Sequence, residues 1–185
     1  AEAGRLIEEG SLSTARGLLD ALERLPERAG REPGETAAAL RTRIADQERR
    51  RAYQAALERV DAADWEAFLA MTGDPAALAP GPDQRARLAR LREEATRYFA
   101  ADLYHWMHER EYLFQIGEVG EQDAARVVEY YPLVLEHMPE GLSRAAVMFY
   151  AAAAHAELGQ AEPARELVER IREELPRSYI VRDGV

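Results

Sequence analysis

Hydrophobic positions recur every three or four residues along most of the chain, and this spacing predicts amphipathic helices separated by Gly and Pro. Residues that favour strands are scarce, whereas Ala, Leu, Arg and Glu, which favour helix, are abundant. The pattern predicts an all-α fold. The clearest examples of the spacing are Leu40, Ile44, Tyr53 and Leu57 in the first half, and Leu167, Val168, Ile171 and Leu175 in the second.

Gly, Pro and capping residues set the expected ends of these helices. Asp64 and Ser143 are expected to cap helices, Gly159 to form a turn, and Pro132 to kink or restart the helix that contains it. A turn is also expected at residues 32–34. The expected helices cover residues 5–9, 14–25, 36–60, a short segment around Trp65, 84–116, 122–137, 144–158, and a last helix with Pro163 in its first turn.

Residues 73–83 contain three Pro and two Gly, a composition typical of a linker. The sequence therefore predicts N-terminal helical hairpins over residues 1–72, a linker over 73–83, and a C-terminal helical region over 84–185. The two helical regions are expected to form one continuous array.

The last helical block has a repeat-like length and spacing. Residues 145–178 number 34, with Gly159 at the turn, Ala164 near the start of the second helix and Pro176 at the end. Around Ala152, a run of small residues allows two helices to approach closely. In these features the block resembles a tetratricopeptide repeat.

Two other segments match the same repeat at fewer positions. Gly10, Ala15 and Pro26 resemble the latter part of a repeat, and residues 108–139 keep the turn-to-Ala spacing through Gly120 and Ala125. The resemblance implies a tetratricopeptide-like α-solenoid of antiparallel helix hairpins.

The resemblance also implies a noncatalytic role in binding a partner protein or peptide along a concave helical surface. Because the C-terminal part of the chain is acidic, the partner is expected to carry Arg or Lys beside its apolar anchors. By resemblance, the groove-facing residues of the last block are Ala146, Phe149, Ala153, Ala156 and Glu157.

Ten of the fourteen aromatic residues lie between Tyr98 and Tyr150, so this region holds either the core or a recognition surface. Phe99, Trp106 and Leu113 fall on the expected core stripe. A neighbouring stripe has polar-tipped rings that suit a half-buried contact surface, although ordinary packing with satisfied hydrogen bonds is the favoured explanation. This stripe consists of Tyr98, His105, His108 and Tyr112.

One helical cluster has side chains that could converge on a metal ion, namely Asp102, His105, His108 and Glu109. Its order is His-x-x-His-Glu, not the His-Glu-x-x-His order of zinc enzymes. A helical metalloprotein is therefore the least favoured interpretation, and no metal or cofactor is expected.

Composition removes several other classes of function. The chain has 35 Ala and 24 Arg but no Cys and no Lys, so disulfides, thiolate catalysis and a P-loop lysine are excluded. We expect a protein that is not an enzyme. The net charge of −10 disfavours nucleic acid, and the longest apolar run, residues 145–154, is too short to cross a bilayer.

A second hypothesis is a structural or assembly role, in which the chain self-associates as an accessory domain of a larger bacterial envelope or signalling protein. The absence of Lys and Asn is typical of a GC-rich bacterial genome. The chain begins at Ala1, which is compatible with a processed start, and both a cytoplasmic and a periplasmic location stay open.

Overall fold

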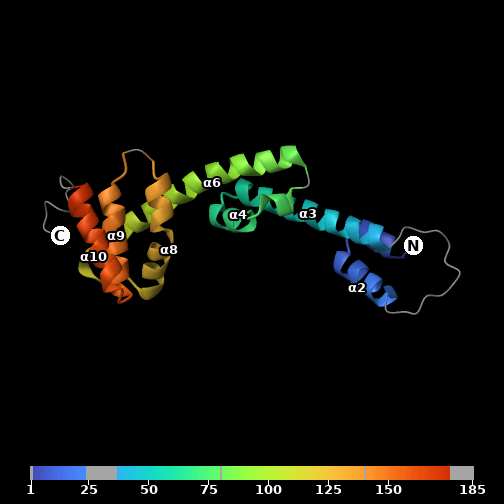
Figure 1. Cartoon of the computed structure of the whole chain (residues 1–185), viewed down its shortest axis with the longest axis horizontal. Helices are drawn as coiled ribbons and strands as arrows, with labels where there is room; N and C mark the ends of the chain where they lie inside the picture. The colour runs from blue at the N-terminus through green and yellow to red at the C-terminus, as the bar shows by residue number, and fades with distance from the viewer. Residues whose placement is uncertain (1, 24–36, 80, 140, 176–185) are drawn as a thin grey trace. The chain divides into compact units, whose positions relative to one another are not determined.

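The structure is a computed structural model that describes residues 2–23, 37–79, 81–139 and 141–175. Every regular element in these ranges is a helix, which confirms the all-α class for this part of the chain (Figure 1). The tetratricopeptide-like solenoid stays a prediction. Leu25, Pro26, the turn at residues 32–34, and Pro176 lie outside the described residues.

The chain divides into two compact units, residues 1–92 and 93–185. The first contains α1 (Glu2–Glu8), α2 (Leu12–Glu23), α3 (Ala37–Asp61), α4 (Trp65–Met71), α5 (Pro75–Leu78) and the first part of α6 (Pro82–Glu109). The second contains the rest of α6, then α7 (Glu111–Ile116), α8 (Glu121–His137), α9 (Arg144–Glu157) and α10 (Ala161–Glu174).

In the first unit, α1 and α2 form a hairpin that packs on the N-terminal part of α3. Gly10 makes the turn at φ +80°, a conformation that side chains other than Gly rarely adopt. Ion pairs between the helices border the contact, with Arg16 2.6 Å from Glu48 and Arg41 3.0 Å from Asp20. The core of this contact is formed by Ala3, Ile7, Leu12, Ala15, Leu19, Leu40 and Ile44.

The segment at residues 73–83, predicted to be a linker, contains the short helix α5 and the start of α6. Asp74 caps α5 by accepting hydrogen bonds from the backbone of Ala76 and Ala77, and Ala79 is buried. The boundary between the units falls between Arg92 and Glu93, inside α6. Pro75 and Pro82 are the first residues of α5 and α6, so these Pro residues mark helix starts and not the boundary between the units.

Arg92 fixes α6 to the end of α4 within the first unit. Its guanidinium donates to the backbone oxygen of Leu69 at 3.0 Å and to the hydroxyl of Thr72 at 2.8 Å. Thr72 is fully buried, and it donates to the backbone oxygen of Phe68 at 2.7 Å. The Leu69 carbonyl, in the last turn of α4, thereby gains a hydrogen-bond partner from outside its own helix.

In the second unit, α9 packs between α8 and α10, and Figure 1 shows the three helices side by side. Ala side chains allow this close packing because they add little volume between the helix axes. Ala145, Ala146, Ala151, Ala152 and Ala154 are all at most 6% exposed.

The prediction of a single helix over residues 84–116 is wrong, because α6 ends at Glu109 and α7 begins at Glu111. Arg110 lies between them with φ −102° and ψ 7°. Its side chain donates to the backbone oxygen of Trp106 and to the Asp123 carboxylate of α8, each at 3.2 Å. The break between α6 and α7 occurs without Gly or Pro, and it is accompanied by the contact between Arg110 and Asp123, which forms only in the folded unit.

Pro132 does not restart its helix, since α8 continues through it from Glu121 to His137. Its side chain is exposed. The cap expected at Ser143 is confirmed, because the Ser143 hydroxyl accepts from the Ala146 backbone at 3.2 Å. The cap expected at Asp64 is confirmed by a bond of 3.3 Å from the Ala67 backbone.

The buried Ala residues of α9 give a direct test of this packing. Replacing Ala151, which is 0% exposed, by Leu should lower the free energy of unfolding by about 1–3 kcal/mol, because the added carbons have no space. Urea unfolding followed by Trp106 fluorescence, in a shared Trp65→Phe background, measures the change in the second unit.

The matched control is Ala125→Leu, at an exposed position of α8. This control should unfold within about 0.5 kcal/mol of the parent protein. Equal urea midpoints for the two variants would show that α9 is not closely packed at Ala151.

Candidate functional site

The candidate site lies on the hairpin of α9 and α10. Ser143 caps the start of α9, and Gly159 adopts φ +71° in the turn between the two helices. The expected position of Pro163, in the first turn of α10, is confirmed. Leu167 and Ile171 are the buried residues of α10, so its remaining faces stay accessible.

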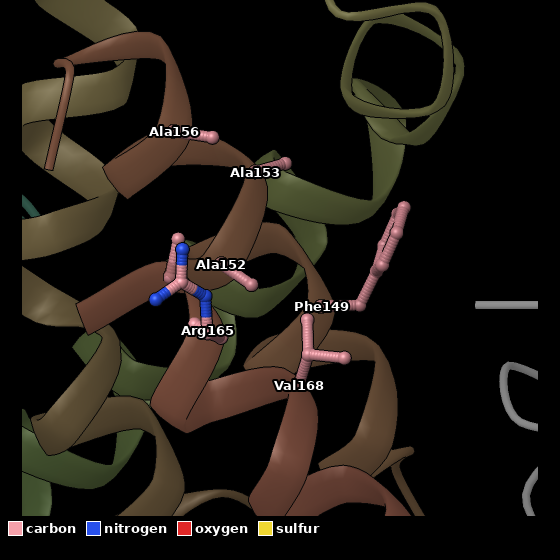
Figure 2. Close-up of a pocket in the computed structure, with 7 residues that line it drawn as sticks. Phe149, Ala152, Ala153, Ala156, Arg165 and Val168 are labelled. Carbon is pink, nitrogen blue, oxygen red and sulfur yellow. The ribbon is translucent and has the colours of Figure 1, made fainter. Parts of the chain in front are cut away.

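An open groove of about 330 Å³ runs between the two helices (Figure 2). Small Ala side chains leave space there, and the larger side chains of Phe149 and Val168 project from α9 and α10. The only ionisable residue of the lining is Arg165. The full lining consists of Phe149, Ala152, Ala153, Ala156, Ala164, Arg165 and Val168.

Three of the five groove residues named from the sequence line this groove, namely Phe149, Ala153 and Ala156. The other two do not. Ala146 is 1% exposed and belongs to the packed interior, and Glu157 is exposed but lies outside the lining.

Sequence reasoning did not place Ala152 or any residue of α10 in the groove. A signal for them exists in the helical spacing. Residues 149, 152, 153 and 156 share one face of α9, and residues 164, 165 and 168 share one face of α10. The groove lies between these two faces, so it can be found only when the face of α10 is considered together with that of α9.

The aromatic stripe predicted from the sequence is exposed at all four positions, Tyr98, His105, His108 and Tyr112. Tyr98 is 56% exposed and Tyr112 is 68% exposed. None of the four lines the groove. They therefore form a surface feature separate from the groove lining.

His108 connects this surface to the interior of the second unit. Its Nδ1 atom lies 3.2 Å from the hydroxyl of Tyr150, and its ring stacks on Tyr104 with centroids 5.9 Å apart. Tyr150 is 0% exposed, and its ring stacks on Phe114 at 5.1 Å. The buried hydroxyl thus has a partner, as buried polar groups generally require.

Two of the three expected core residues of this region are only half-buried. Trp106 lies beneath the guanidinium of Arg110, 4.4 Å from the ring centroid, and Leu113 is also half-buried. Phe99 is buried as expected and meets Tyr130 edge-on, with centroids 5.2 Å apart. Cationic side chains cover the tryptophan because guanidinium groups pack well on indole faces.

The described residues contain no group of three or more side chains placed to hold a metal ion. Asp102, His105, His108 and Glu109 are exposed, and the Nδ1 atom of His108 lies near Tyr150 and, at 3.4 Å, the Glu111 carboxylate. The buried His155 has its Nδ1 atom 2.6 Å from the side-chain oxygen of Gln160. The geometry gives the metalloprotein interpretation no support.

Comparison with known proteins gives no relative, since no family model, no curated protein and no solved structure matches the chain.

The contact between His108 and Tyr150 predicts a measurable stability effect. Tyr150→Phe removes one hydroxyl from the interior and should lower the free energy of unfolding by about 0.5–1.5 kcal/mol. Urea unfolding measures the change, with Tyr112→Phe on the exposed surface as the control that should behave like the parent. A Tyr150→Phe protein as stable as the control would contradict a stabilising hydrogen bond at this site.

Proposed function

We propose that this chain is a noncatalytic protein-binding module that holds a helix of a protein partner in the groove between α9 and α10. The observation that carries the proposal is the groove itself, an open trough in which six of the seven lining residues are apolar. An apolar surface of this kind gains free energy when a partner removes it from water.

The shape of the groove favours a helix as the occupant. Ala153 and Ala156 have small side chains, so a partner backbone can come close to α9. Two parallel walls of side chains suit the helix-in-groove mode of recognition, in which side chains at positions i, i+3, i+4 and i+7 fill the trough. Phe149 and Val168 offer the larger apolar contacts at its side.

The lining also supports a role without catalysis. It contains no hydroxyl, carboxylate or imidazole group, and its one ionisable residue, Arg165, is 2.7 Å from Glu162 in an exposed pair. General acid–base chemistry needs a group that titrates near the working pH, and a guanidinium does not.

The local charge changes the expected chemistry of the partner. The sequence predicted Arg or Lys beside the partner's apolar anchors because the C-terminal region is acidic. The charge at the groove itself comes from Arg165, which favours a carboxylate on the partner at this point. No helix among the described residues is long and apolar enough to cross a membrane.

Site-specific photocrosslinking tests the proposal in the cells that produce the protein. We expect p-benzoylphenylalanine at position 156, an exposed residue of the groove, to form an adduct with another protein chain. A second substitution, Phe149→Glu, should reduce that adduct at least about fivefold, because a carboxylate in an apolar contact must be desolvated.

Position 125, exposed on α8 and outside the groove lining, is the matched control for the photoreactive group. Tyr112→Glu is the control for the added charge and should leave the adduct at position 156 unchanged. Adducts of equal yield at positions 125 and 156, or none at either position, would contradict binding in the groove.

A further inference from the structure

The outer surface of α10 carries an ordered pattern of charge beside the groove. Four exposed residues follow one another along this flank of the helix at spacings of three, four and three, so they lie on successive turns. In chain order their charges alternate as negative, positive, negative and positive. The residues are Glu162, Arg165, Glu169 and Arg172.

When this order of charges is read in the opposite direction, each charge faces one of opposite sign. When two copies of one helix pack antiparallel about a two-fold axis, the same flank of each copy faces the other in reversed order. Glu162 then faces Arg172 of the second copy, and Arg165 faces Glu169 of the second copy. All four positions meet an opposite charge, which favours this encounter over a parallel alignment in register, where like charges meet.

The charged flank is continuous with the apolar groove. Arg165 belongs to both, and Val168, which lies three residues further along α10, is part of the groove lining. An α10 helix of a second copy can therefore place its own Val168 against Phe149 and the Ala residues while its charges face this flank. Apolar burial and charge pairing occur in the same arrangement.

We propose that the occupant of the groove is α10 of a second copy of this chain, packed antiparallel to form a two-fold symmetric dimer. This inference rests on the proposed function, because it names the partner of the same groove. Each copy both offers a groove and fills one, so the contact closes after two copies and does not extend into a filament.

The size of this surface sets the expected strength of the dimer. A helix of 14 residues such as α10 is about 21 Å long. The surface that each copy buries in this dimer spans only two such helices, so its area is smaller than the roughly 800 Å² per partner of stable complexes. We therefore expect a dissociation constant on the order of 100 μM. The dimer then forms mainly where the concentration of the chain approaches this dissociation constant.

Sedimentation equilibrium of the purified chain tests the inference, over concentrations from about 10 μM to about 1 mM around the expected dissociation constant. The dimer fraction should rise over this range. Arg165→Glu should weaken dimerisation at least about tenfold, because the new carboxylate faces Glu169 of the second copy twice in each dimer. The double variant Arg165→Glu/Glu169→Arg restores opposite charges and should return to within about threefold of the parent.

Arg170→Glu is the matched control, because it makes the same change of charge on the same helix. It lies about 140° around the helix from Arg165, where the structure pairs it with Glu174 at 3.1 Å. Its dimerisation should equal that of the parent. Far-UV circular dichroism of every variant confirms that the helices remain folded.

The outcomes separate this inference from the proposed function. A chain that stays monomeric up to about 1 mM, while position 156 cross-links to a different protein, overturns the dimer and leaves the groove as a binding site. A dimer that Arg165→Glu does not weaken, or that the double variant does not restore, overturns the assignment to α10. If position 156 cross-links only to residues within the same molecule, and to no second copy or other protein, both the dimer and the proposed binding in the groove are overturned.

Discussion

The close packing of α9 between α8 and α10 is the constraint on which the second unit depends. It requires side chains of minimal volume, and α9 supplies them in a run of Ala residues that includes the fully buried Ala151 and Ala154. Larger residues complete the interior from the same helix, since Tyr150 contacts Phe114 of α7 and His108 of α6. A single helix thereby organises the packing of its unit.

The same small side chains account for the groove. Where another helix covers α9, its Ala residues allow tight packing. Where α9 is less covered, Ala153 and Ala156 leave an open trough against α10. The helix binding proposed above depends on the apolar lining, and the proposed dimer depends on the alternating charges of α10. The proposed binding and the proposed dimer are consequences of one surface.

Much of the fold could be predicted from local signals. The caps at Asp64 and Ser143 and the turn at Gly159 depend on side chains and backbone conformations within a few residues, which a sequence displays directly. The break at Arg110 could not be predicted in this way. It is accompanied by a contact with Asp123 of α8, thirteen residues away in the chain.

The candidate site was predicted in part for a similar reason. The resemblance to a tetratricopeptide repeat named Phe149, Ala153 and Ala156, whereas Arg165 and Val168 required knowledge of which face α10 turns beside α9. The same resemblance named Ala146, which the structure places in the packed interior. Its burial depends on the neighbouring helices, which periodicity within one helix does not specify.

NMR with a soluble nitroxide measures the solvent accessibility of methyl groups, and in a dilute sample of the full chain it shows directly whether the groove is open. If the groove is open, the methyl groups of Ala156 and Val168 are broadened nearly as strongly as that of the exposed Ala125, while the methyl of the buried Ala151 is protected. Protection of Ala156 and Val168 equal to that of Ala151 would show that the groove is closed within the single chain and that no partner helix binds there.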